Sequence, residues 1–243
     1  MPANAAYGTD LAYIHDTGFG ELANSAAPGL LRAIAQCGGA SKLVVDLGCG
    51  SGIWARHLAD AGYQVTGVDI SAAMIEIAHE QVPEGTFHLQ SFVDFPIPMC
   101  RAVTAIGEVF SYQFDEQNSL ATLGQVFRGI FEALVSGGML IFDVVVPGRH
   151  AGMKQAFREG DDWACLVEFL HDEPGQQLTR RIVTFRRWGD TYRRQEETHR
   201  QQLYQVAEIA EELRSIGFLV EVVAGYSDQP FPAGVAGFIA RKP

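Results

Sequence analysis

The sequence predicts an α/β protein, built on a doubly wound, mostly parallel sheet of seven strands with a small antiparallel β insertion as a cap. Three observations support this prediction. Short apolar stretches alternate with amphipathic helical ones up to about Val145. Period-two alternation then runs from Trp163 to Tyr204, and helical periodicity returns at Val206–Ile216 before two last apolar stretches. Strands that alternate with helices favour a parallel sheet, whereas consecutive strands joined by tight turns favour an antiparallel one.

The first half supplies five strands of the expected sheet. A helix over 20–37 leads into it. The strands are expected at 42–47, 64–69, 86–90, 102–107 and 138–145, with helices at 53–61, 72–81 and 116–135. The segment Ser136–Val145, SGGMLIFDVV, indicates a helix C-cap turn that runs straight into a buried fifth strand.

The second half supplies the insertion and the last two strands. Three antiparallel strands are expected between Trp163 and Tyr204, joined by turns at Glu173–Gly175 and at Gly189-Asp190. In the following helix, Val206–Ile216, the apolar residues share one face, and Gly217 ends it. Strands at 218–225 and 235–241 then complete the sheet.

Composition narrows the class of protein. The chain has 243 residues, 47% of them hydrophobic, which suffices for one good core. A net charge of −11 argues against a nucleic-acid binder. No stretch approaches the ~20 apolar residues of a membrane helix, and the start, MPANAAYGTD, lacks the form of a secretory signal. We therefore expect a soluble, cytoplasmic protein without membrane contact, whose oligomeric state the sequence leaves open.

The cysteines and the acidic and imidazole side chains give no sign of a metal site. Cys37, Cys49, Cys100 and Cys165 are far apart and form no C-x-x-C pair, which predicts reduced thiols. No tight cluster of His, Asp and Glu is found, so no metal is expected.

A glycine turn is the most informative motif. Leu43–Gly52 reads LVVDLGCGSG, in which Asp46 precedes Gly48, Gly50 and Gly52. Glycines at the end of a strand leave backbone N–H groups and bare backbone for a polar cofactor to approach. The spacing fits neither the dinucleotide fingerprint G-x-G-x-x-G nor a P-loop. An ordinary tight strand-to-helix turn is the alternative.

Two further segments support a nucleoside-containing cofactor. Tyr63–Ile70, YQVTGVDI, is a second apolar strand that ends in Asp69, where a carboxylate can accept both ribose hydroxyls. Ser71 is then a natural N-cap, and Met74 lies one turn into the next helix. The Met74 thioether could lie against an adenine face or simply fill the core.

The acid-x-Gly-x-Gly-x-Gly motif at Asp46–Gly52 and the D-x-S-x-x-M motif at Asp69–Met74 resemble those of the class I S-adenosylmethionine-dependent methyltransferases, which have a Rossmann-like fold. The resemblance implies S-adenosylmethionine (SAM) as cofactor and S-adenosylhomocysteine (SAH) as product. It also implies in-line methyl transfer to an oxygen or nitrogen atom of a small-molecule acceptor. The resemblance in fold covers nearly the whole chain, but specific motifs occur only in the first half.

The same resemblance divides the chain into four parts. Residues 1–40 would form an N-terminal lid and approach helix, and residues 41–150 the SAM-binding core. Residues 151–204 would form the cap over the substrate pocket, because an insertion after the fifth strand leaves the sheet at its carboxyl edge. Residues 205–243 would complete the core sheet.

The cofactor contacts are expected along the carboxyl edge of the sheet. Where the family usually carries an acid for the adenine amine, this chain has Ser91 and Phe92, and the first acid comes later, at Asp94, so backbone groups could make that contact. The expected cofactor-binding residues are Asp46, Gly48, Cys49, Gly50, Gly52, Asp69, Ile70, Met74, Ser91, Phe92, Gly107, Glu108 and Tyr13. For Cys49, a small side chain beside the cofactor is favoured over a nucleophile.

A general base is needed only if the acceptor atom carries a proton. The candidates are His199, which strand alternation places on one face with Glu197 and Gln201, and His15 in the N-terminal segment. For His199 the alternative is a solvated strand position. Tyr112, after the fourth strand, is a further pocket candidate that could instead be core. Tyr13 could cover the methionine end of the cofactor or pack within the lid.

Arginines are concentrated in the expected cap, although the chain as a whole is acidic. They are Arg180, Arg181, Arg186, Arg187, Arg193, Arg194 and Arg200, opposed locally by Asp190, Glu196 and Glu197. Cross-strand ion pairs on a wet sheet face would explain them, and so would an anionic acceptor or a surface that binds a partner. The second hypothesis predicts that Arg194→Ala raises the KM for the acceptor.

Two other functions remain open on the sequence alone. A non-catalytic protein that binds SAM or SAH would need the same Asp46, Gly48, Gly50 and Asp69. It would differ from an enzyme in releasing no SAH in the presence of acceptors. An NAD-dependent oxidoreductase is disfavoured by the glycine spacing.

Overall fold

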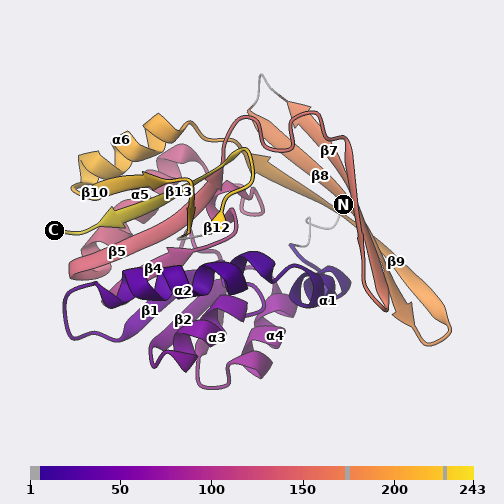
Figure 1. Ribbon diagram of the computed structural model, residues 1–243, viewed down its shortest axis with the longest axis horizontal. Helices are drawn as coiled ribbons and strands as arrows, with labels where there is room; N and C mark the ends of the chain where they lie inside the picture. Colours follow the sequence, from indigo (N-terminus) through magenta and orange to yellow (C-terminus); the bar gives the residue numbers. More distant parts are fainter. Residues whose placement is uncertain (1–5, 173–175, 227–228) are drawn as a thin grey trace.

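Two β-sheets of different kinds dominate the computed structural model, which describes residues 6–172, 176–226 and 229–243 (Figure 1). One is a long twisted sheet covered by helices, and the other is an antiparallel sheet that stands beside its edge. The hairpin turn expected at Glu173–Gly175 lies outside the described residues.

The core sheet has seven strands. In spatial order they are β10 (Leu219–Val223), β13 (Val235–Arg241), β5 (Leu134–Val145), β4 (Cys100–Ala105), β1 (Leu43–Leu47), β2 (Gln64–Asp69) and β3 (Thr86–Leu89). The five strands from β5 to β3 pair in parallel, and β13 pairs antiparallel with both β5 and β10. The doubly wound, mostly parallel sheet predicted from the sequence is therefore confirmed.

Helices cover both faces of this sheet. Those of the described chain are α1 (Thr9–Gly18), α2 (Glu21–Ala35), α3 (Ile53–Asp60), α4 (Ala72–Gln81), α5 (Leu120–Ala133) and α6 (Val206–Ile216), with a 3₁₀ turn η1 (Val109–Ser111). Alternate strand residues face opposite sides. Val44 thus packs with α2, α3 and α4, whereas Val45 packs with α5 and α6.

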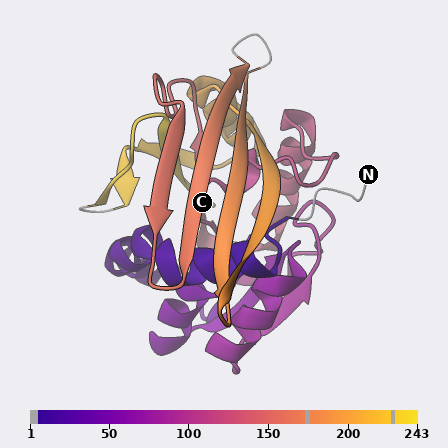
Figure 2. The same ribbon diagram turned by 90° about the vertical axis from the view of Figure 1, so that its right-hand side faces the viewer.

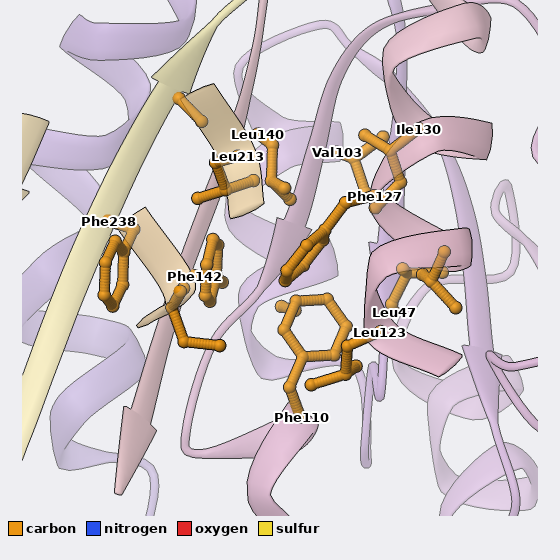
Figure 3. Close-up of a cluster of buried hydrophobic side chains, with 14 of the residues drawn as sticks. Leu47, Val103, Phe110, Leu123, Phe127, Ile130, Leu140, Phe142, Leu213 and Phe238 are labelled. Atoms are coloured by element: carbon orange, nitrogen blue, oxygen red, sulfur yellow. The ribbon is translucent and has the colours of Figure 1, made fainter. Parts of the chain in front are cut away.

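Aromatic residues build the core under α5 and α6 (Figure 3). Phe110 and Phe127 meet edge to face with ring centroids 5.6 Å apart, and Phe142 stacks on Phe238 at 4.9 Å. Such contacts add to the area that each ring buries. This packing fixes the carboxyl ends of β4 and β5, from which the site is built.

The cap contains four antiparallel strands, seen face-on in Figure 2: β6 (Gln155–Glu159), β7 (Trp163–Asp172), β8 (Gln177–Trp188) and β9 (Thr191–Gln202). β7, β8 and β9 confirm the three strands predicted between Trp163 and Tyr204. β6 precedes them and was not predicted, because all five of its residues are exposed and carry no apolar alternation. A short two-stranded sheet pairs β11 (Gly225–Tyr226) with β12 (Gln229–Pro230).

The helix expected over 20–37 is confirmed as α2, and a further helix, α1, precedes it and was not predicted. The helix C-cap turn expected at Ser136 was wrong. α5 ends at Ala133, and β5 already begins at Leu134. Ser136 and Gly137 therefore form an irregularity inside β5, where the pairing register with β4 shifts, and not a helix C-cap.

Helix α1 is fastened to the inner face of the cap. The Trp163 ring fills the space beside Gly18, where a Cβ would lie 2.5 Å from the indole. Asp10, which is fully buried, accepts hydrogen bonds from Arg186 and Arg193 on two neighbouring cap strands. The α1 helix and the cap thus form one packed unit above the edge of the core sheet.

Candidate active site

One cavity runs along the carboxyl edge of the core sheet and under α1. Its lining comes from the glycine turn, the ends of β2, β3 and β4, η1, and helices α1 and α2. The lining residues are Ala6, Tyr7, His15, Phe19, Leu22, Ala23, Gly48, Gly50, Val68, Asp69, Ile70, Met74, Gln90, Ser91, Phe92, Ile106, Gly107, Val109, Tyr112, Phe114 and Asp115. Ligands of open α/β sheets bind at this edge.

Gly48 and Gly50 need to be glycine for different reasons. Both have positive φ, +64° and +54°, which strains other residues. A Cβ at Gly48 would lie 2.5 Å from Val109, so this position is closed by packing. A Cβ at Gly50 would meet nothing within 4 Å, and it would point into the cavity. Gly50 therefore leaves a cradle of bare backbone that fits a close-lying cofactor.

The Asp69 carboxylate is held in place at the end of β2. It accepts hydrogen bonds from the N–H groups of Gly50 at 2.9 Å and of Ser71 at 2.8 Å. Burial raises the pKa of Asp69, and these two bonds counteract the rise. Each carboxylate oxygen keeps lone pairs that can accept ribose hydroxyls from the cavity side. The Asp69 carboxylate is thus fixed beside the glycine turn.

Five other predicted cofactor residues line the same cavity: Ile70, Met74, Ser91, Phe92 and Gly107. The Ser71 side chain caps α4 by accepting from the Met74 N–H at 3.1 Å, as expected. Gly107 has φ +95°, and a Cβ there would meet nothing within 4 Å. Gly107 is thus a second position at which bare backbone lines the cavity.

Five predicted cofactor residues do not line the cavity: Tyr13, which is described below, and the four that follow. Asp46 is buried and accepts from Thr104 at 2.7 Å, and burial raises its pKa to about 7. Cys49 is buried, and burial raises the pKa of its thiol well above the usual value, which opposes a nucleophilic role. Gly52 packs against Ala78, and Glu108 points toward the cap. These residues support the glycine turn and the strand ends, and they lie outside the cavity.

The other end of the cavity is aromatic. Tyr112 stacks on Phe114 with centroids 4.9 Å apart, and His15 stacks on Phe19 at 6.1 Å. Tyr7 meets both pairs edge-on, at 5.3 Å from His15 and 6.3 Å from Tyr112. Asp115 completes this end. The sequence thus predicted His15 and Tyr112 as cavity residues.

Tyr7, and not the predicted Tyr13, is the N-terminal tyrosine that lines the cavity. Tyr13 is not among the cavity residues: its hydroxyl donates to Asp162 at 3.1 Å, and Arg186 lies 3.6 Å above its ring. Tyr7, by contrast, is anchored to both sides of the cavity. Its carbonyl accepts from Ser71 at 2.8 Å, and its hydroxyl lies 3.1 Å from that of Tyr112. No periodicity marks Tyr7, which explains why sequence reasoning missed it.

The two candidate histidines lie close to Tyr7. His199 is only 1% exposed, which excludes the solvated position considered from the sequence, and its Nε2 lies 2.8 Å from the Glu197 carboxylate. Its ring is 4.9 Å from that of Tyr7, behind the cavity wall. Burial lowers the pKa of His15 to about 4, so His15 is neutral at pH 7. The Nδ1 atoms of both rings are buried without a hydrogen-bond partner.

A buried ionic cluster fastens the cap to β4. Glu108 accepts from Arg149 at 2.8 Å, from Arg180 at 2.6 Å and from Gln201 at 3.0 Å. Burial alone would raise the pKa of Glu108, but the two guanidinium groups outweigh burial and lower it to about 2. Arg180 also donates to the Tyr112 hydroxyl at 3.1 Å. The turn that holds Glu108 is fixed from below by Asp143, which accepts from both Gly107 and Glu108 N–H groups.

The cap arginines divide between two sheet faces. Arg180, Arg186 and Arg193 point inward and pair with Glu108 or Asp10. Arg181 and Arg194 share Glu196, and Arg181 also reaches Glu168. Arg194 is 49% exposed and does not line the cavity. Ion pairs on a wet sheet face therefore describe Arg181 and Arg194, whereas the other three arginines pair with buried acids outside the cap sheet. The structure gives no support to the hypothesis that Arg194 holds an anionic acceptor.

Sequence reasoning missed other residues of the site besides Tyr7. Phe114, Asp115 and Phe19 lie in irregular or terminal segments that no motif marks. Arg180 was one of seven candidates, and only its pairing with Glu108 distinguishes it. One signal could have pointed to Arg180: Glu108 follows a buried strand, and a buried acid needs a charged or hydrogen-bonding partner.

The chain matches the family model described as a methyltransferase domain over residues 44–138. A protein of Geobacillus sp. strain WCH70, whose name describes it as a methyltransferase, is 30% identical over 208 residues, which cover 78% of this chain and 79% of that protein. Among solved structures, a SAM-dependent methyltransferase from Clostridium acetobutylicum has a TM-score of 0.81 at 17% identity and covers 96% of this chain and 98% of its own. The sugar N-methyltransferase KedS8 from Streptoalloteichus has a TM-score of 0.74 at 18% identity, with 100% and 98% covered.

The chain belongs to the class I SAM-dependent methyltransferases and is an enzyme of that family. Its cofactor is SAM, which becomes SAH. The bare backbone at Gly50, the fixed Asp69 carboxylate and the opening at Gly107 fit this cofactor. The two alternatives considered from the sequence, a non-catalytic SAM binder and an NAD-dependent oxidoreductase, are thereby set aside.

Within residues 6–172, 176–226 and 229–243, no group of three or more His, Cys, Asp or Glu side chains is arranged to hold a metal ion. In the same ranges, no helix has both the length and the apolar character needed to cross a membrane.

Proposed function

We propose that this enzyme methylates an oxygen or nitrogen atom of a small-molecule acceptor bound at the aromatic end of the cavity. One observation carries the proposal: the residues that fit the cofactor and the aromatic end belong to a single cavity. An acceptor beside Tyr7 and Tyr112 would lie next to the cofactor, in a space that α1 helps to close. The small-molecule specificity of the KedS8 neighbour is consistent with an acceptor of this size.

In this proposal the protein contributes position and a dry environment. SAM, when bound, supplies a methyl group activated by its sulfonium charge. Asp69 and the glycine turn hold the nucleoside and the amino-acid part, and the Gly107 backbone leaves room beside them. Aligning an acceptor with such a group can supply much of the barrier reduction without a catalytic triad.

His15 is the histidine in direct contact with the acceptor space, because it lines the cavity. Its pKa of about 4 keeps the imidazole neutral at pH 7, so it can accept a hydrogen bond from an acceptor O–H or N–H. His199 lies behind Tyr7 with Glu197 and is a positioning residue in this proposal. It holds the ring of Tyr7 against the cavity.

A screen for SAH release tests this function. The purified protein is incubated with SAM and groups of small hydroxyl, carboxyl and amine compounds, and SAH is measured by mass spectrometry. We expect release above background with at least one group, and a loss of that release in Asp69→Ala. Asp60→Ala removes an exposed carboxylate and should behave as wild type. Release with macromolecular acceptors alone would contradict the proposal.

A further inference from the structure

The acceptor end of the cavity combines aromatic faces with negative charge. The charged side chains among the cavity residues are Asp69 and Asp115, and both are acids. Asp69 lies at the nucleoside end, whereas Asp115 lies beside Phe114 at the aromatic end. The carboxylate of Asp115 accepts a hydrogen bond from the Gln117 N–H at 2.9 Å, which holds it in a turn.

The charged groups around the aromatic end of the cavity do not make it positive. The Arg180 guanidinium donates to the Tyr112 hydroxyl, but Glu108 binds the same guanidinium at 2.6 Å. Arg149 binds the other oxygen of Glu108, and Glu197 stands behind Tyr7 and His199. His15 adds no positive charge at pH 7, because its pKa is about 4. Arg158 lies over the Phe19 ring, 4.8 Å from its centroid, so a cation would bind away from Phe19, on the side of the cavity lined by Asp115.

The rings offer the geometry that organic cations prefer. Tyr7, Tyr112, Phe114 and Phe19 all line the cavity. Arginine guanidinium groups lie over the rings of Phe19 and Tyr112, so Tyr7 and Phe114 are the rings that a ligand cation would use. The faces of aromatic rings attract ammonium groups, most strongly where water is excluded. A carboxylate acceptor would find no free donor cation among the described cavity residues, whereas an ammonium group would find rings and a carboxylate.

We infer that the acceptor is an amine, held at this end as its ammonium form by the aromatic rings and Asp115. This inference rests on the proposed function and narrows its acceptor atom to nitrogen. The ammonium first loses its proton to water. The nitrogen lone pair then forms a bond to the methyl carbon while the carbon–sulfur bond breaks, and that electron pair stays on sulfur. The products are a methylated ammonium ion and SAH.

A binding experiment with unreactive probes tests the inference without any turnover. Ligand-observed NMR would measure the affinity of choline, of its neutral isostere 3,3-dimethyl-1-butanol and of the anion 3,3-dimethylbutanoate for the protein saturated with SAH. We expect choline to bind about tenfold more tightly than the alcohol, with the anion weakest. An alcohol or anion that binds as tightly as choline, or no choline binding at all, would overturn the inference.

Matched variants show which residues give the protein its preference for choline over the neutral alcohol. Asp115→Asn keeps the turn acceptor but removes the charge, and Phe114→Leu removes a ring; each should reduce the preference for choline at least threefold by weakening the attraction to the cation. Asp94→Asn removes an equal charge that does not line this cavity and should leave the preference unchanged. Melting temperatures measured with SAH show whether each variant is folded.

The same data separate the inference from the proposed function. If SAH is released only with hydroxyl or carboxyl compounds, the enzyme is a small-molecule methyltransferase and the amine inference is wrong. If choline is preferred but no small molecule releases SAH, the charge inference stands and the proposed function is wrong.

Discussion

At the scale of single residues, the cofactor end of the cavity depends on glycines, which have no side chain to fill it. Gly50 and Gly107 both adopt positive φ, and a Cβ at either would enter open space. Gly48 has the same kind of backbone, but its missing side chain makes room for Val109. The three glycines look alike in the sequence, yet only the fold shows which of them face a ligand.

Gly50→Ala and Gly62→Ala form a matched pair. Both glycines have positive φ, and neither has a neighbour within 4 Å of the added Cβ. Each substitution should cost about 1–2 kcal/mol of unfolding free energy, because alanine is strained in this conformation. Gly50→Ala alone should weaken SAM binding in calorimetric titration, since Gly62 is not a cavity residue. An equal loss of SAM affinity in both variants would contradict the assignment.

Asp46 should give the protein a measurable dependence of stability on pH. Burial raises the pKa of its carboxyl from 3.8 to about 7. Between these values the folded state holds a proton that the unfolded state has released, so stability falls as pH rises from about 4 to about 7. Asp46→Asn cannot titrate and should lose this part of the fall, as measured by urea unfolding at pH 5 and pH 7.5. A pH profile identical to that of wild type would show that Asp46 is not the group responsible.

At the scale of elements, the cap is joined to the core by few but buried contacts. The Glu108 cluster links β4 to β8 and β9, and the Asp10 cluster links α1 to the same two strands. The strand periodicity of the sequence predicted which residues of β9 share a face with His199. It could not predict the partners, because Asp10 and Arg193 are far apart along the chain.

Two neighbouring arginines of β8 test this view. Arg180→Met leaves the buried carboxylate of Glu108 with one guanidinium partner instead of two. We expect a loss of about 3 kcal/mol in unfolding free energy from urea denaturation. Arg181→Met removes an exposed ion pair from the opposite face and should remain close to wild type. Similar losses in both variants would mean that the cluster does not fasten the cap.

At the scale of the whole molecule, the core sheet was predictable because each strand carries its own apolar pattern. The motifs at Asp46–Gly52 and Asp69–Met74 lie in this regular half, and residues of both motifs line the cavity. The aromatic end was only half predictable. Tyr7, Phe114 and Asp115 come from irregular segments whose positions depend on tertiary packing. β6 was missed for the related reason that an exposed edge strand needs no apolar alternation.

The division of the chain into four functional parts, at about residues 40, 150 and 204, stays a prediction. The cap strands lie between Gln155 and Gln202, within the predicted insertion. The packing of α1 against the cap suggests that residues 9–18 belong with the cap more than with α2.

Isothermal titration of the purified protein with SAM and with NAD tests the central claim most directly. The account predicts saturable binding of SAM and none of NAD. It also predicts that Asp69→Ala weakens SAM binding at least about tenfold, because a buried hydrogen-bonded carboxylate is lost, whereas Asp60→Ala does not. A wild-type protein that binds no SAM, or an Asp69→Ala variant with undiminished affinity, would contradict it.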